Sequence, residues 1–110
     1  MPAYHWIYTT WPDAESAAVA ARTLVGDGLC ACANIQPEMT SLYVWEGEVQ
    51  EERETVMILK ASASSLAPLR QRFLTLHPYD VPCFAVLDIQ ADGSHQPYLE
   101  WLAAKAPKPM

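Results

Sequence analysis

The architecture of this chain depends on residues 34–60, NIQPEMTSLYVWEGEVQEERETVMILK. β-Branched and aromatic residues, which favour strands, are concentrated toward its middle and its end. The segment therefore predicts a hairpin in which two strands fold back on each other, with their cores at Thr40–Trp45 and Thr55–Lys60 and a reversal at Glu46-Gly47-Glu48. Gly47 supplies the backbone freedom that the reversal needs.

Both faces of this hairpin are apolar in the sequence. Tyr43 and Trp45 point to one side of their strand, because successive side chains alternate. Leu42 and Val44 point to the other side, and the return strand, Thr55–Lys60, is also apolar on both sides. A hairpin with one face in water would alternate apolar and polar residues, so we expect a layer on each face. Helices of the same chain can cover one face, and another subunit is the expected cover of the other.

The composition favours one domain that assembles with copies of itself. A length of 110 residues fits a single domain, residues 1–110. Hydrophobic residues make up 51 % of the chain and charged residues 18 %, which is more apolar surface than a small monomer hides and favours a permanent oligomer. The net charge of -6 argues against nucleic acid and anionic membranes as partners, since both require basic patches.

The sequence also predicts where the chain works. Its start, MPAYHWIY, lacks the basic region and long apolar run of a signal peptide. No apolar stretch approaches the roughly 20 residues of a membrane span. The three cysteines, Cys30, Cys32 and Cys83, have no zinc-ribbon spacing, so reduced thiols are expected. We therefore predict a soluble, cytoplasmic domain.

The rest of the chain predicts strands and helices that alternate around the hairpin. A strand at Tyr4–Thr10 is followed by a helix that begins after its cap, Asp13, and ends at Gly26. The second strand is entered at Cys30–Ile35 and has a bulge or bend near Pro37. After the hairpin come a helix capped by Ser64 or Ser65, a strand at Cys83–Ile89 and a short helix at Pro97–Ala104. The tail, residues 105–110, is expected to be disordered. The order β-α-β-β-α-β with an appended helix predicts an α+β, ferredoxin-like fold, in which both main helices cover one face of a four-stranded antiparallel sheet.

Several short motifs resemble those of the CutA family, which are divalent-cation tolerance proteins. In chain order they are TTWPD, CANI, TSLYVWEGEV, ILK, LHPYDVP and YLEWL. The similarity runs from about Ile7 to Leu102, and the combination of YVWEG with HPYDVP is specific. The resemblance implies a homotrimer of ferredoxin-like subunits, whose sheets meet across a three-fold axis and whose hairpins extend onto neighbours. It also implies a relation in shape to the PII signalling proteins.

The resemblance further implies a candidate metal site at His77. Some members of the family are described as binding copper through a cysteine in the first strand and two adjacent histidines before the PY pair. These positions hold Thr9, Leu76 and His77 here, whereas a divalent copper site needs several donor atoms in a fixed geometry. His77 is therefore either a contact for Cu²⁺, another divalent cation or a small ligand, or a structural cap at the end of its helix. His5 and His95 are expected at the surface.

A cleft between subunits is the second candidate site. Lys60, in the apolar ILK strand, is expected either to reach a carboxylate, such as that of Glu46, or to face this cleft. Cys32 and Cys30 either form a soft-metal pair on one strand face or pack as small hydrophobic residues. The aromatic residues assigned to the cleft, or else to the intersubunit core, are Tyr43, Trp45, Tyr79 and Trp101.

Three functions are compatible with these features, the third being a purely structural trimer whose stability helps another assembly, and catalysis is the least expected. The sequence shows no nucleophile beside a base, no phosphate loop and no metalloprotease helix. The first hypothesis is a trimeric, cytoplasmic protein of divalent metal-ion tolerance or response, with copper as the implied ion. The alternative is a PII-like signalling scaffold that holds a small ligand, such as an anion bound by Lys60, in the cleft. The short reversal of the hairpin offers no long loop of the kind that PII proteins use.

Overall fold

The computed structural model describes residues 3–104 of the chain. Its strands are β1 (Tyr4–Trp11), β2 (Cys32–Trp45), β3 (Glu48–Ser62) and β4 (Phe84–Asp88). Its helices are α1 (Ala14–Gly26), α2 (Leu66–Leu76) and α3 (Gln96–Ala104), and a 3₁₀ turn, η1 (Ala63–Ser65), precedes α2. The predicted disorder of residues 105–110 lies outside the described residues. No helix within residues 3–104 is long and apolar enough to cross a membrane.

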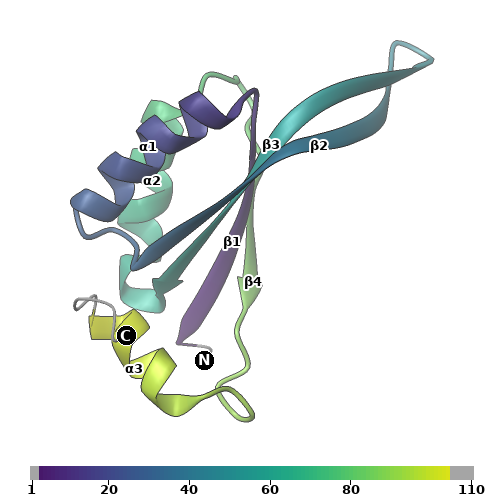
Figure 1. Cartoon of the computed structure of the whole chain (residues 1–110). Coiled ribbons are helices and arrows are strands. Elements are labelled where there is room, and N and C mark those ends of the chain that lie inside the picture. The colour runs from purple at the N-terminus through teal and green to yellow at the C-terminus, as the bar shows by residue number, and fades with distance from the viewer. Residues whose placement is uncertain (1–2, 105–110) are drawn as a thin grey trace.

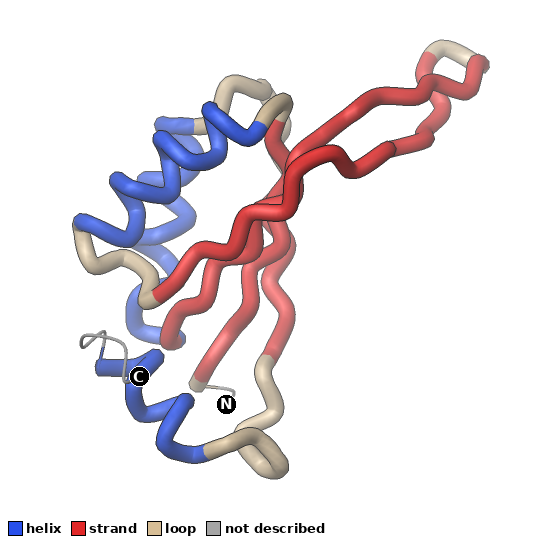
Figure 2. Tube along the Cα trace, in the orientation of Figure 1, coloured by secondary structure: helices blue, strands red, loops and turns tan. Residues whose placement is uncertain are grey.

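The strands form one antiparallel sheet in the order β2-β3-β1-β4. Helices α1 and α2 lie together on one face of this sheet, and α3 lies at the end where both termini are found (Figure 1). The tube view in Figure 2 shows the same two layers. The predicted α+β class, the β-α-β-β-α-β order and the additional C-terminal helix are confirmed.

The core lies between the helices and the sheet face that carries Ile7, Thr9 and Trp11, all fully buried. Helix α1 can lie close to this face because its inner positions hold small side chains, those of Ala17, Ala20 and Ala21. Helix α2 contributes Leu69 and Phe73. The ring of Phe73 meets the ring of Trp11 edge to face, with 5.5 Å between the centroids. This aromatic pair holds α2 against β1.

The opposite face of the sheet, here called the open face, is covered by neither α1 nor α2. It carries Trp6 and Leu87, which lie opposite each other on β1 and β4. It also carries Lys60 of β3, whose register partner on β1 is Trp6. Trp6 is 41 % exposed and Leu87 is 50 % exposed. Large apolar side chains gathered on one sheet face are typical of a surface that another chain covers.

The turn of the β2–β3 hairpin sets the register of its two strands. The chain reverses at Glu46-Gly47, so that Trp45 pairs with Glu48. The largely acidic segment 48–54 therefore lies opposite residues 39–45. The following segment, Thr55–Lys60, pairs with β1 on one side and with the first half of β2 on the other. The predicted reversal at Glu46-Gly47-Glu48 is confirmed, and a two-residue turn there fixes the register of every pair that follows it.

The outer part of the hairpin, residues 39–54, projects away from the sheet and is here called the arm (Figure 1). The register shifts between Gln36 and Met39 where the arm begins, and Glu38 there has a φ of 62°. The predicted bulge near Pro37 is confirmed. The arm exposes its apolar side chains, since Val44 is 68 % exposed and Val49 is 72 % exposed. A two-stranded ribbon with such a surface favours contact with a further chain.

The turn of the arm has a residue poorly suited to its backbone, and this leads to a prediction. Glu46 and Gly47 both have positive φ, 50° and 81°, as a type I′ turn requires, and Asn-Gly is the preferred pair there. We expect Glu46→Asn to raise the free energy of unfolding by about 0.5–1 kcal/mol, because asparagine tolerates this conformation better than glutamate. Chemical denaturation at fixed protein concentration measures the change. Equal or lower stability of the variant would contradict it.

The two main helices begin differently. Asp13 caps α1, since its Oδ1 accepts a 2.7 Å hydrogen bond from the Ser16 N–H, and these bonds to Ser16 lower the pKa of the Asp13 carboxyl. The predicted cap of α1 is confirmed. At α2 the N-cap residue is Ser65, which has helical backbone angles and makes no side-chain capping bond. The predicted position of the cap at Ser65 is confirmed, but its side chain makes no capping bond, because η1 leads the backbone directly into the helix.

Candidate functional site

A groove of about 800 Å³ lies between the arm and the loop that follows α2. The arm contributes side chains from one face only, because they occupy alternate positions on β2 and β3. The loop and the adjoining strand ends contribute the remainder. The lining residues are Thr10, Tyr43, Trp45, Gln50, Glu52, Glu54, Tyr79, Asp80, Val81 and Cys83. This groove, here called the arm groove, combines aromatic rings with carboxylates.

A short hydrogen bond organises the wall formed by the arm. The Tyr43 hydroxyl donates to Glu52 Oε1 at 2.6 Å, and this bond raises the pKa of Tyr43. Across the groove, burial raises the pKa of Tyr79, and the charges of Glu54 and Glu52 raise it further. Both rings therefore remain neutral phenols at neutral pH. They can donate hydrogen bonds to carboxylates, and they present uncharged aromatic faces.

The thiol of Cys83 is held in its protonated form. Burial raises its pKa, and the nearby charge of Glu54 adds to the shift. Its Sγ lies 3.7 Å from the backbone oxygen of Tyr8, to which the thiol donates. A thiol with a raised pKa is a poor nucleophile and a poor metal ligand at neutral pH. Its place in the groove therefore gives no support to covalent catalysis.

Only part of the predicted cleft comes together in one chain. Tyr43, Trp45 and Tyr79 line the arm groove. Trp101 does not, since it lies on α3, where its ring is 5.7 Å from that of Tyr98. Glu46 lies in the turn at the tip of the arm.

Lys60 and Cys32 lie together at the far end of the sheet. They are register partners on β3 and β2, and the Lys60 Nζ lies 5.2 Å from the ring centroid of Trp6. The in-chain pairing of Lys60 with Glu46 is wrong, because Glu46 is at the opposite end of β3. Cys30 precedes β2 and is buried in the core. The two thiols therefore do not share one strand face, and the alternative, packing as a small hydrophobic residue, is confirmed for Cys30.

His77 is built into the core, with both ring nitrogens engaged. Its Nε2 lies 2.7 Å from the Thr10 backbone oxygen and must donate, since a carbonyl can only accept. Its Nδ1 lies 3.1 Å from the Tyr79 backbone nitrogen and must accept, since an amide N–H can only donate. The ring is the neutral tautomer and has no further lone pair for a metal ion in this arrangement. The side chain ties the loop after α2 to β1, while its backbone N–H ends α2 by bonding Phe73.

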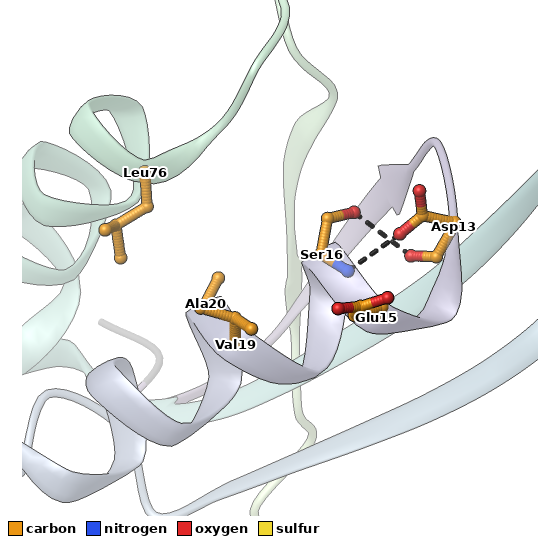
Figure 3. Close-up of a pocket in the computed structure, with 6 residues that line it drawn as sticks. All are labelled: Asp13, Glu15, Ser16, Val19, Ala20 and Leu76. Carbon is orange, nitrogen blue, oxygen red and sulfur yellow. Dashed lines mark hydrogen bonds between the residues drawn. The ribbon is translucent and has the colours of Figure 1, made fainter.

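The other two positions implied for copper are also structural. Thr9 is fully buried, donates from Oγ1 to the Met57 backbone oxygen at 2.7 Å and accepts from Trp11 Nε1 at 2.8 Å. Leu76 lies in a different, smaller pocket between α1 and α2 (Figure 3). No group of three or more histidine, cysteine, aspartate or glutamate side chains within residues 3–104 is arranged to hold a metal ion.

The role of Thr9 can be tested by removing its hydroxyl. We expect Thr9→Val to lower the free energy of unfolding by about 1–3 kcal/mol, because the buried Trp11 N–H loses its acceptor. Thr9→Ser keeps the hydroxyl and is the matched control, so it is expected to lose less. Chemical denaturation of both variants makes the comparison. A Thr9→Val protein as stable as the original would show that the hydrogen bond from Trp11 to Thr9 does not contribute to the free energy of unfolding.

The smaller pocket of about 340 Å³ is a weaker candidate site than the arm groove. Figure 3 shows that its polar side chains gather at the start of α1, where Ser16 bonds to Asp13. These bonds satisfy the first turn of the helix. The pocket is therefore explained by helix capping, without a ligand.

The remaining histidines differ in their surroundings. His95 is exposed, as predicted. His5 is only 6 % exposed, and its Nδ1 lies 3.0 Å from Asp88 Oδ1. The predicted surface position of His5 is wrong, because it lies on the core side of β1, where α3 packs at the end of the sheet.

Sequence reasoning missed the carboxylates of the arm groove. Glu52 and Glu54 were not assigned to a site, although their spacing of two already fits one face of a strand. Asp80 follows Tyr79 directly and could have been assigned with it. Cys83 could have been assigned to the same site, since it directly follows the HPYDVP segment that contains Tyr79.

Comparisons with known proteins agree over almost the whole chain. The family model of the CutA1 divalent ion tolerance protein matches residues 5–105. The chain is 41 % identical over 102 residues to the divalent-cation tolerance protein CutA of Pyrococcus horikoshii, which covers 93 % of this chain and 97 % of the relative. It is 40 % identical over 96 residues to the chloroplastic CutA protein of Arabidopsis thaliana, which covers 87 % of this chain and 52 % of the relative. The crystal structure of CutA1 from Oryza sativa is similar with a TM-score of 0.88, at 34 % identity, covering 98 % of this chain and 97 % of that one.

Proposed function

This chain belongs to the CutA1 divalent ion tolerance family, and from that premise we propose that it acts in divalent metal-ion tolerance as a cytoplasmic homotrimer without catalytic activity. Copper is the first ion to test. The observation that carries the proposal is the match to the family over nearly the full length of the chain. The apolar open face and the exposed arm support the assembly, because one chain leaves both uncovered.

The geometry favours a particular form of metal response. The described residues offer no in-chain group of three or more ligands, and His77 has both nitrogens occupied. A tight divalent site therefore requires ligands from more than one chain of the assembly. We accordingly place the tolerance function in the assembled protein and not in the separate subunit.

The assembly is tested by placing an aspartate at each of two leucines that have similar exposed fractions. Leu87 on the open face is 50 % exposed, and Leu74 on the outer side of α2 is 52 % exposed. Light scattering is expected to show a trimer for the original protein and for Leu74→Asp, but separate subunits for Leu87→Asp. A monomeric original protein, or a trimer that survives Leu87→Asp, would overturn the assembly that we propose.

The tolerance role is tested in cells that are sensitive to copper. Expression of the original chain is expected to permit growth at higher Cu²⁺ concentrations than an empty vector, and expression of Leu87→Asp is expected to lose that advantage. Leu74→Asp serves as the control for expression and folding. Growth that does not depend on the chain would overturn the proposed role, whatever the assembly state.

A second candidate function is a small-ligand scaffold, and the arm groove favours it. Its volume of about 800 Å³ falls within the range of small-molecule sites. An anionic ligand is not supported, because Lys60 lies away from the groove. Ligand-dependent shifts of the thermal midpoint, measured without metal, distinguish this function from the first.

A further inference from the structure

We propose that the arm groove binds an organic ammonium cation, a small molecule whose amine meets the carboxylates and whose carbon chain lies against the aromatic rings. The inference rests on the second candidate function and is independent of the metal-ion role. It identifies the chemical class of the ligand from the charge, the rings and the size of the groove.

The charge of the groove selects a cation. Glu52, Glu54 and Asp80 line it, and none of its lining residues is lysine, arginine or histidine. The strand alternation of β3 places Glu52 and Glu54 on the groove side of the arm and directs Arg53 to the other side. Carboxylates of one sign gathered in one groove raise the local concentration of cations.

The aromatic side chains suit an amine that carries carbon. Tyr43 and Trp45 line one wall, and Tyr79 comes from the opposite one. A cation over the face of an aromatic ring is attracted by its quadrupole, and methylene groups bury apolar surface against the same ring. The Tyr43 hydroxyl bonds one oxygen of Glu52 and thereby orients that carboxylate. The groove thus offers an oriented charge beside apolar surfaces.

The size of the groove argues against a bare metal ion as its natural occupant. A divalent cation needs several ligands converging within about 2–3 Å of one point. No such group of histidine, cysteine or acidic side chains occurs among residues 3–104. A volume of about 800 Å³ instead accommodates a small organic molecule.

The test uses the complete, assembled protein with putrescine and spermidine as probes. Calorimetric titrations at low and at near-physiological ionic strength are expected to show saturable binding of both amines. The uncharged diol of the same length as putrescine is expected not to bind. Spermidine is expected to bind more tightly than putrescine, because it presents an additional charge to the same carboxylates.

Matched variants locate the site. Glu52→Gln is expected to weaken binding about tenfold, because one charge-assisted contact is lost. Glu51→Gln removes the same charge from the opposite face of the arm, where its register partner is Leu42, and is expected to change binding less than about twofold. Tyr79→Leu is expected to weaken binding about fivefold through the loss of a ring. Light scattering confirms that each variant keeps the original assembly.

Several outcomes would overturn the inference. Absence of saturable binding to the original protein would do so, as would equal binding of the diol. Equal weakening by Glu52→Gln and Glu51→Gln would show a general attraction of the acidic surface. Failure of the copper growth test leaves all of these outcomes unchanged, so the two proposals can fail separately.

Discussion

Trp11→Ala is expected to lower the free energy of unfolding by about 3–5 kcal/mol. Trp11 is fully buried, its ring meets that of Phe73 edge to face, and its centroid lies 4.2 Å from that of His77. Truncation removes these contacts and leaves a cavity where β1, α2 and the following loop meet. It also leaves Thr9 without its indole donor.

Chemical denaturation measures this loss, at one protein concentration because assembly contributes to apparent stability. Trp11→Phe is the control, since it keeps a buried ring and loses only the indole N–H and part of the volume. We expect it to lose about half as much stability or less. A loss of less than about 1 kcal/mol in Trp11→Ala would contradict the packing described for this part of the core.

His77→Ala is expected to lower the free energy of unfolding by about 3 kcal/mol and to leave Cu²⁺ binding unchanged. The Thr10 oxygen and the Tyr79 N–H each lose a partner, and an unsatisfied buried group costs about 1–3 kcal/mol. The ring also packs against those of Phe73 and Tyr79, at 5.3 and 4.8 Å between centroids. These contacts give the His77 ring a structural role in linking the loop after α2 to β1 and to the core.

Two measurements on the reduced, metal-stripped protein test this assignment together. Denaturation gives the stability, and a calorimetric Cu²⁺ titration gives the metal affinity. His95→Ala removes an exposed histidine and serves as the matched control. His77→Gln, whose amide can still donate to Thr10, is expected to recover part of the stability. If His77→Ala were as stable as the original and lost stoichiometric Cu²⁺ binding, the ring would have to be reassigned as a metal ligand.

Local patterns were sufficient to predict the elements and their order. Asp13 before an alanine-rich run predicted α1, and the prolines around Tyr79 predicted the break between α2 and β4. These signals are contained within a few neighbouring residues. Alternation also placed Tyr43 and Trp45 on one face of β2, and the groove confirms that they share a side.

Contacts between distant residues could not be predicted in the same way. The partner of the His77 ring is Thr10, 67 positions away, and nothing in either neighbourhood indicates the other. The sequence predicted the reversal at Glu46-Gly47-Glu48 but not that residues 48–54 continue as a strand, because charged residues are common in both turns and exposed strands. Lys60 was expected either to reach a carboxylate, such as that of Glu46, or to face the cleft, whereas the register places Trp6 and Cys32 beside Lys60.

The backbone of the arm leaves strand edges without a described partner. β1 pairs with β3 only as far as Thr55, so residues 48–54 of β3 have β2 on one side and no described strand on the other. The outer edge of β2 is likewise unpaired by any described strand. Exposed strand edges recruit other chains indiscriminately and start aggregation. Charged side chains along such an edge oppose that recruitment. The glutamates of the arm therefore supply charges of the kind that oppose aggregation along these edges.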